Sequence, residues 1–204
     1  MLDSLWLVHP DEAMCEAFRH RFAGLPNVRI LRDSFEDLEP HDCFVTAGNA
    51  FGIMTAGIDA AVTRRFGQEL MNRVQHTIMD RYFGEQPVGT AFIVPTNDSS
   101  LPYLCHAPTM RVPGSIDGTD KVYAATWAAL LAIHAHNQTA DQRIEVVAMP
   151  AMGTGFGGVP FDEGARQMAV AYRHFLEPPH RLDWEFVAQR QHAICYDGGK
   201  QVVR

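Results

Sequence analysis

The stretch that decides the fold is VVAMPAMGTGFGGVP, residues 146–160, in which an apolar run passes into a glycine-rich loop. A second stretch, CFVTAGNAFGIMTAGID at residues 43–59, has the same order: an apolar run, a polar Asn49 and then small residues. A helical pattern follows each of them. Continuous apolar runs joined to helices are typical of strands in a sheet that is covered on both faces. Ligands bind such sheets beyond the carboxyl ends of the strands, so these two loops form the candidate site.

The rest of the chain repeats this alternation of short apolar runs and helical patterns. Apolar runs predict strands at residues 5–8, 28–31, 43–47, 90–94, 144–149 and 192–196, with a short strand at 103–105 framed by turn-rich segments. The aromatic-rich segment 182–187 is interpreted as a late strand or the approach to one. Three- and four-residue spacing of apolar residues predicts helices at 11–22, 58–82, 120–137 and from 162 to the residues before Pro178. The pattern predicts a three-layer α/β/α fold around a central mixed, largely parallel sheet.

Composition narrows the class of protein. At 204 residues, 47% hydrophobic and 20% charged, the chain has enough apolar material for one core, and a single domain over residues 1–204 is expected. The formal net charge of −7 argues against a long nucleic acid held by a basic surface. No apolar run is long enough to span a membrane, and the N-terminus has no basic segment typical of a signal peptide. A cytoplasmic location is expected.

Cysteine and histidine spacing gives no sign of a metal or redox centre. The four cysteines lie far apart in apolar surroundings, so we expect them to be reduced core residues: Cys15, Cys43, Cys105 and Cys195. His134 and His136 are two residues apart on a helical pattern and point to different faces. We therefore predict no metal and no cofactor. No GxSxG motif and no Gly-Lys-Ser/Thr phosphate loop is present, so a serine hydrolase and a nucleoside triphosphatase are both disfavoured.

The two glycine-rich loops favour an anionic ligand on physical grounds. Glycine allows positive φ and a close approach of the backbone to a ligand. Successive N–H groups at a strand end, followed by a helix N-terminus, form a concave site for phosphate oxygens. Two such loops beside one crevice suit a diphosphate better than a single phosphate.

Three segments resemble the macro domain, a module that binds ADP-ribose. VTAGN at residues 45–49 is similar to the family's V-N-A-A-N, and PAMGTGFGGVP at 150–160 resembles its P-A-I-S-x-G-I-Y-G-x-P, equal in length. Arg32, Asp33 and Ser34 follow a predicted strand as the family's G-D-I does. Together the segments span about residues 28 to 175. The resemblance implies the macro-domain fold and, as partner, ADP-ribose or an ADP-ribosylated protein or small molecule.

The resemblance also implies roles for individual residues. Asp33 would accept a hydrogen bond from the adenine amino group, the Ser34 backbone would hold the same ring, and Asn49 would contact the distal ribose. The loop at 153–158 would cradle the diphosphate, with residues 52–57 on its other side. The remaining implied ligand-binding residues are Gly52, Thr55, Gly57, Ile58, Gly153, Thr154, Gly155, Phe156 and Gly157.

Asp59 is the candidate catalytic residue, with Asn49 as its working partner. In macro domains that hydrolyse ADP-ribosyl groups a G-G-G-V-D segment opens the helix, and residues 55–59, TAGID, resemble it at the same ten-residue step from Asn49. A carboxylate there would position or deprotonate a water molecule. The helix N-terminus is expected to favour its ionised form.

Several positions depart from the family's pattern. Thr55 and Ala56 replace two glycines, Thr46 replaces an asparagine, and Gly157 stands where an aromatic residue covers the distal ribose. Phe156 or Phe51 is the alternative source of that stacking ring. Three functions stay open: a hydrolase acting on ADP-ribosylated protein or on a 1″-phosphate or O-acyl ester of ADP-ribose, a non-catalytic ADP-ribose- or nucleotide-binding module, and a pocket for another ligand such as a nucleic-acid end.

Overall fold

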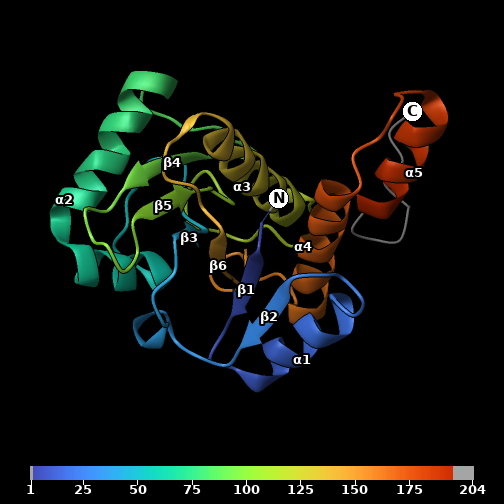
Figure 1. Cartoon of the computed structure of the whole chain (residues 1–204), viewed down its shortest axis with the longest axis horizontal. Coiled ribbons are helices and arrows are strands. Elements are labelled where there is room, and N and C mark those ends of the chain that lie inside the picture. Colours follow the sequence, from blue (N-terminus) through green and yellow to red (C-terminus); the bar gives the residue numbers. More distant parts are fainter. Residues whose placement is uncertain (1, 195–204) are drawn as a thin grey trace.

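One mixed sheet forms the centre of the protein, and a computed structural model describes it for residues 2–194 (Figure 1). Within these residues the strand order is β2-β1-β6-β3-β5-β4. All neighbouring pairs are parallel except β4 and β5, which are antiparallel. The strands are β1 (Ser4–Val8), β2 (Val28–Leu31), β3 (Cys43–Thr46), β4 (Phe92–Pro95), β5 (Tyr103–His106) and β6 (Val146–Pro150). The predicted mixed, largely parallel sheet is confirmed.

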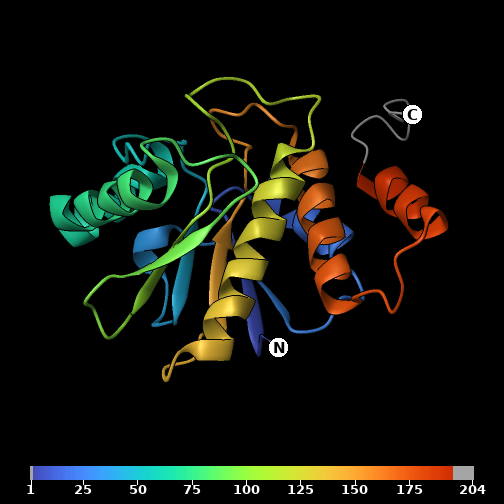
Figure 2. The ribbon, with the colours of Figure 1, turned by 90° about the horizontal axis from the view of Figure 1, so that it is seen from above.

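Helices cover both faces of this sheet, as the three-layer prediction requires (Figure 2). α1 (Glu12–Arg21), α3 (Lys121–Thr139) and α4 (Phe161–Leu176) pack on one face. α2 (Gly57–Tyr82) and the short 3₁₀ turn η1 (Phe35–Asp37) pack on the other. α5 (Trp184–Ile194) lies outside α4, away from the sheet.

β1 shows why the strands are apolar along their whole length. Leu5 and Leu7 point into the core formed with α1, α3 and α4, whereas Trp6 and Val8 point into the core formed with α2 and η1. Alternate side chains of a strand face opposite sides of the sheet. Both sides are buried here, so the strand has no polar face.

Local sequence sets the ends of the helices. The Asp11 side chain accepts a hydrogen bond from the Ala13 N–H at 2.8 Å and caps α1. α4 ends at Leu176, before the two prolines. α2 covers the predicted range 58–82, but it is broken at Gly67, which has φ 76° and ψ 179°. Glycine adopts this backbone conformation readily because it has no Cβ atom.

The predicted strands at 182–187 and 192–196 are wrong. Residues 184–194 form α5, while residues 195 and 196 lie outside the described residues. α5 packs on α3 and α4, where Arg190 lies over the Trp127 ring at 4.6 Å and donates to the Tyr123 hydroxyl at 3.2 Å. The segment never reaches the sheet, and none of its residues is buried. Its contact with α3 includes Arg190, which also lies 5.5 Å from the Phe186 ring, whereas Trp184 is exposed.

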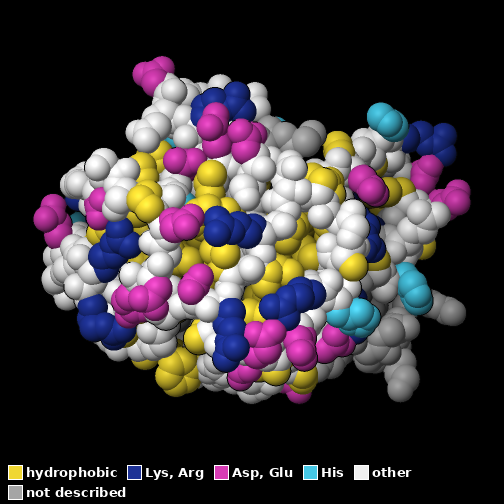
Figure 3. All heavy atoms as spheres, turned by 60° about the horizontal axis from the view of Figure 1, so that its bottom comes forward, with side chains coloured by type: hydrophobic (Ala, Val, Ile, Leu, Met, Phe, Trp, Pro, Cys, Tyr) yellow, Lys and Arg dark blue, Asp and Glu magenta, His cyan; other side chains and the backbone are white. Residues whose placement is uncertain are grey.

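The described cysteines match their expected environment. Cys15, Cys43 and Cys105 are buried and unpaired, and burial raises the pKa of Cys105 to about 12. Cys195 lies outside the described residues. None of the described helices is long and apolar enough to cross a membrane. On the face in Figure 3, basic and acidic side chains are interspersed around a region of hydrophobic ones, so neither sign of charge dominates that face.

Candidate active site

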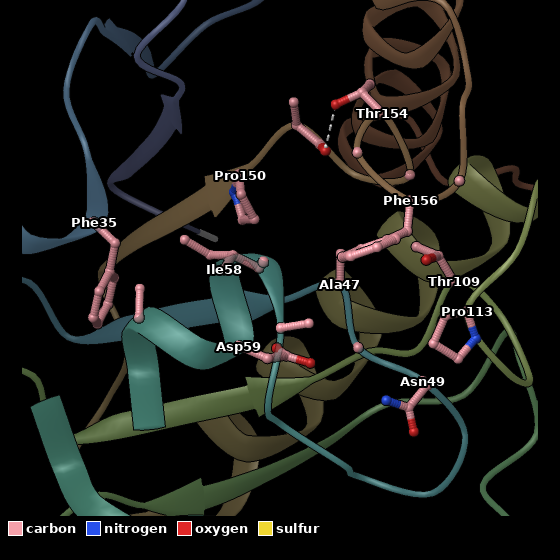
Figure 4. A pocket seen from close by; sticks show the side chains of 18 of the residues that line it. Phe35, Ala47, Asn49, Ile58, Asp59, Thr109, Pro113, Pro150, Thr154 and Phe156 are labelled. Carbon is pink, nitrogen blue, oxygen red and sulfur yellow. Dashed lines mark hydrogen bonds between the residues drawn. The ribbon is translucent and has the colours of Figure 1, made fainter. Parts of the chain in front are cut away.

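A cavity of about 560 Å³ lies at the carboxyl ends of the parallel strands, between the two glycine-rich loops. One wall is the segment from β3 to the start of α2, and the other is the loop from β6 to α4 (Figure 4). The predicted site residues in its lining are Asp33, Ser34, Asn49, Thr55, Gly57, Ile58, Asp59, Gly153, Thr154, Gly155, Phe156 and Gly157. The fold thus brings segments more than 100 residues apart to one crevice.

Gly52 is the predicted ligand-binding residue that does not line the cavity. A Cβ atom at this position would lie 2.9 Å from the side chains of Val74 and Ile78 on α2. Its φ is +62°, and its N–H donates to the Asn49 carbonyl at 3.1 Å. Gly52 lets the loop turn tightly against α2.

The loop between β6 and α4 presents a row of backbone donors. Gly153 and Gly158 have positive φ, and the loop is closed by Val159 N–H donating to the Gly153 carbonyl at 3.2 Å. Among the described residues, the N–H groups of residues 154–157 have no hydrogen-bond acceptor. Successive free N–H groups on a curved backbone attract anions.

The start of α2 supplies a second set of donors on the opposite wall. Ala56 precedes the helix and provides no side-chain cap. The first N–H groups of a helix have no acceptor within the helix, so those of Ile58 and Asp59 are available to a ligand. The helix dipole adds partial positive charge at this end. The cavity is therefore suited to an anion held between two backbone walls.

Phe156 joins the two walls at the mouth of the cavity. Its ring carbons lie 3.7 and 3.9 Å from the Cβ position of Gly57, and its side chain is 64% exposed. Gly157 beside it has no room for a side chain, because a Cβ there would lie 2.3 Å from the Gly153 carbonyl oxygen. Phe51 also lines the cavity, with the Arg111 guanidinium 5.8 Å from its ring centre. Both alternative stacking rings are thus present at the site.

Asp59 lies deep in the wall, 6% exposed, and its Oδ1 atom has no hydrogen-bond partner among the described residues. Burial raises its pKa from 3.8 to about 7, and the neighbouring Thr46 hydroxyl opposes that shift. The helix N-terminus is expected to favour the ionised form, but burial works against it, and the carboxyl group is close to half ionised at neutral pH. Desolvation penalises the charged form by more than the dipole stabilises it.

Asn49 is held by its own loop. Its Nδ2 donates to the Ile53 carbonyl at 2.8 Å, and its Oδ1 accepts from the N–H groups of Phe51 and Ile53 at 3.1 and 3.3 Å. An asparagine amide has two N–H donors and two acceptor lone pairs. One Nδ2 hydrogen therefore remains for a ligand, and the rest of the amide shapes the wall.

The far end of the cavity is built around η1. Asp33 and Ser34 follow β2, and β1 and β6 separate this strand from β3 in the sheet. The Ser34 hydroxyl donates to the Asp37 carboxylate. The backbone of residues 33–35 is therefore the part of this segment that can hydrogen-bond a ligand. Phe35 lies at this end of the cavity (Figure 4). The site is elongated, with Asp33 at one end and Asp59 toward the other.

Sequence reasoning missed some residues of the site. Thr109 and the exposed Val112 lie on the loop after β5 and line the cavity. Arg64 on α2 also lines it and forms an ion pair with Glu36 at 2.8 Å. These positions lie in turn-rich or ordinary helical sequence, with no motif to mark them. Thr154 hydrogen-bonds the Ala151 carbonyl at 3.0 Å and thereby braces the loop (Figure 4).

No group of three or more His, Cys, Asp or Glu side chains in residues 2–194 is arranged to hold a metal ion. The groups that the site offers a ligand include backbone donors, aromatic faces, the Asn49 amide and the buried Asp59 carboxyl group.

Comparison with known proteins gives one family. The model of the family described as "Macro domain" matches residues 45–168. An uncharacterized protein of Aquifex aeolicus is 30% identical over 150 residues, 73% of this chain and 82% of its own length. An uncharacterized protein of Aeropyrum pernix is 34% identical over 147 residues, 70% of each chain.

Solved structures share the fold at low identity. The macrodomain of Mycobacterium tuberculosis DarG has a TM-score of 0.54 and 22% identity, over 66% of this chain and 83% of that one. A mutant Oceanobacillus iheyensis macrodomain with ADPR has a TM-score of 0.58 and 20% identity, over 68% and 73%. The Trypanosoma brucei macrodomain in complex with ADP-ribose has a TM-score of 0.54 and 16% identity, over 81% and 75%. With a family model matched over more than half of its length, and with both glycine-rich loops on one cavity, this chain belongs to the macro domain family.

Proposed function

We propose that this protein binds ADP-ribose in the cavity and hydrolyses ADP-ribosyl groups, either from proteins or from a small derivative such as a 1″-phosphate or an O-acyl ester. The observation that carries the proposal is the pair of backbone walls, residues 154–157 and the start of α2, with the Asp59 carboxyl group in the first turn of that helix. The solved macrodomains that contain ADP-ribose support the ligand.

The two walls suit a diphosphate for electrostatic reasons. Each wall offers N–H groups without an internal acceptor, and neither contributes a fixed full charge that would bind any anion equally well. In this arrangement the adenine end lies toward Asp33 and η1, and the distal ribose lies toward Asn49 and Phe156. The lining includes Asp33 and Phe35 as well as Asn49 and Phe156, which supports a ligand with a base at one end and a sugar at the other.

Asp59 supplies the chemistry in this proposal. In its ionised form it takes a proton from a water molecule while the water oxygen forms a bond to the carbon under attack. The same carboxyl group then returns the proton to the leaving oxygen as the old bond breaks, which regenerates the carboxylate. A pKa near 7 suits both transfers, since the group is close to half ionised at neutral pH.

A binding module without catalysis is the second candidate. Two observations favour it: most of the Asn49 amide is bonded within its own loop, and Asp59 is only 6% exposed. The two candidates differ in what Asp59 does, and one substitution separates them.

The test joins calorimetric titration with a hydrolysis assay. Wild-type protein is expected to bind ADP-ribose with micromolar affinity and to bind AMP and ADP more weakly. Asp59→Asn should lower hydrolysis of ADP-ribosylated protein by at least 100-fold and leave the ADP-ribose Kd within a few-fold, because the amide keeps the shape and loses the base. Asp80→Asn, an exposed change on the same helix, is the matched control.

Three outcomes count against parts of the proposal. Wild-type protein without hydrolysis but with tight binding supports the binding module. Equal losses of binding and turnover in Asp59→Asn make Asp59 a ligand-holding residue. Absence of ADP-ribose binding at millimolar concentration overturns the ligand itself and points to a different one, with single nucleotides as the next probes.

A further inference from the structure

At the wall of the cavity around Asp59, four buried side-chain atoms lack a hydrogen-bond partner of good geometry among the described residues. They are Thr46 Oγ1, Asp59 Oδ1, His106 Nε2 and Thr109 Oγ1. The Thr46 hydroxyl still lies near enough to the Asp59 carboxyl group to lower its pKa. Most buried polar atoms in proteins are paired, so a group of unpaired ones at one place calls for an explanation. Their residues come from three parts of the chain: the ends of β3 and β5 and the first turn of α2.

Gly48 lies next to three of these four residues: His106, Asp59 and Thr109. A Cβ atom on Gly48 would lie 2.6 Å from His106 Nε2 and 3.1 Å from Asp59 Oδ2. Thr46 pairs with His106 in the register of β3 and β5, and the Thr109 N–H donates to the Gly48 carbonyl at 3.1 Å. Nε2 and Oδ2 are therefore no farther apart than the sum of their distances from the Gly48 Cβ position. One water molecule with hydrogen bonds of about 2.8 Å on each side can bridge a gap of that size.

The contacts of Gln86 assign the tautomer of His106. Gln86 Nε2 faces the carbonyl groups of Thr90 and His106 at 3.2 and 3.4 Å, so its Oε1 is the acceptor. This oxygen lies 2.6 Å from His106 Nδ1. Nδ1 therefore carries the hydrogen, and Nε2 presents a lone pair toward Gly48 and Asp59.

We propose that His106 Nε2 is the hydrogen-bond acceptor for the protonated Asp59 carboxyl group, directly or through one bridging water, and that His106 is a positioning residue for hydrolysis. The inference rests on the proposed function. When Asp59 has taken the proton of the attacking water, its new O–H group points to Nε2. The proton stays on Asp59 and passes from there to the leaving oxygen, so His106 orients the acid without changing its own charge.

The surroundings leave Asp59 and His106 as the titratable pair. His106 packs against Thr46 on β3, Gln86 before β4 and the Phe92 ring on β4 at 5.5 Å, none of which titrates. Burial lowers the pKa of His106 to about 4, so the ring stays neutral while Asp59 titrates near 7.

Two arginines near the cavity are held in ion pairs. Arg64 of α2 pairs with Glu36 at 2.8 Å, and Arg111 after β5 pairs with Glu85 at 2.7 Å. Asp33 and His9 belong to the β2 and β1 side of the sheet.

The first experiment tests the contact between Asp59 and His106 Nε2 independently of catalysis. In ¹⁵N histidine spectra of the wild-type protein, His106 should show the Nδ1–H tautomer, with Nε2 shifting in one step centred near pH 7 as Asp59 loses its proton. The step should be absent in Asp59→Asn. A His106 ring that carries its hydrogen on Nε2, or whose Nε2 resonance is constant from pH 5 to 9, overturns the proposal.

The second experiment reads the pH dependence of hydrolysis. His106→Asn keeps a donor for Gln86 and removes the acceptor at Nε2. The low-pH limb of the kcat profile should move down by about one pH unit, the effect of one lost hydrogen bond to the protonated carboxyl. kcat should fall about 10-fold, with KM nearly unchanged.

His41→Asn is the matched control for that variant. His41 is also buried with an unpaired Nε2, but it does not itself line the cavity and packs against Trp6 and Phe44, of which Phe44 lines the cavity. The pH profile of kcat in His41→Asn should match that of the wild type. An unmoved profile in His106→Asn contradicts the positioning role. If the wild-type protein has no hydrolase activity, the proposed function fails, and the ¹⁵N titration still decides whether Asp59 contacts His106.

Discussion

At the scale of the residue, Asp59 shows two opposing physical effects at one carboxyl group. A helix N-terminus stabilises a negative charge by about 0.3–1 kcal/mol at exposed positions. Burial at 6% exposure works in the other direction and raises the pKa from 3.8 to about 7. Position in the sequence reveals the first effect, and only the packing around the side chain reveals the second. The proposed catalyst is therefore close to half protonated at neutral pH.

This shift predicts a pH-dependent stability for the protein. The folded state keeps the Asp59 proton up to about pH 7, whereas the unfolded chain loses it near pH 3.8. The folded state therefore binds more protons between these values, and the free energy of unfolding falls as the pH rises through that window. Asp59→Asn removes this cost, which at about 1.4 kcal/mol per pKa unit amounts to a few kcal/mol.

The measurement is urea denaturation of wild type and Asp59→Asn at pH 4.5 and pH 8. The variant should gain stability relative to the wild type at pH 8 and little at pH 4.5. Asp80→Asn, exposed on the same helix, should give the same small difference at both values. If Asp59→Asn gains the same stability at both pH values, the Asp59 carboxyl group of the wild type has the same pKa in the folded and unfolded states.

At the scale of the element, the loop from β6 to α4 depends on glycine for two separate reasons. Gly153 needs positive φ, at +73°. Gly157 lacks positive φ, but it packs against the loop's own backbone, and its carbonyl accepts from the Ile116 N–H at 2.8 Å. Gly155, by contrast, has open space where a Cβ would be. We therefore expect the loop to tolerate a methyl group at Gly155 but not at Gly157.

Alanine substitutions at Gly157 and Gly155 test this difference. Gly157→Ala should lower the free energy of unfolding by about 1–3 kcal/mol, because its Cβ would lie 2.3 Å from the Gly153 carbonyl oxygen. It should also weaken ADP-ribose binding at least 10-fold, since residues 154–157 must shift. Gly155→Ala should change stability by less than about 0.5 kcal/mol. Thermal denaturation and calorimetric titration measure the pair, and equal destabilisation by both would contradict this account.

At the scale of the whole molecule, the sheet separates two hydrophobic cores, and only one of them also shapes the ligand site. The core between the sheet and α2 includes Phe44, which is fully buried and also lines the cavity. The core between the sheet and α1, α3 and α4 includes Leu130, equally buried and outside the cavity lining. Stability depends on both cores, and the shape of the ligand site depends chiefly on the first.

Phe44→Ala and Leu130→Ala should therefore destabilise alike and bind differently. Each removes a fully buried side chain, which costs about 2–5 kcal/mol. Phe44→Ala should weaken ADP-ribose binding several-fold at a temperature where it is still folded, and Leu130→Ala should leave the Kd within twofold. Denaturant titration gives the first quantity and calorimetry the second. A Kd that rises equally in both variants would mean that the site responds to global stability.

The sequence by itself determined the layers, the mixed sheet and the two walls of the cavity, because apolar runs, helical spacing and glycine positions are local properties. Tertiary structure alone decided the break at Gly67, the helix at residues 184–194 and the place of Gly52 against α2. It also decided the raised pKa of Asp59 and the approach of Asp59 and His106 to Gly48. These features depend on burial and on contacts between residues distant in the chain, and neither leaves a periodic pattern in the sequence.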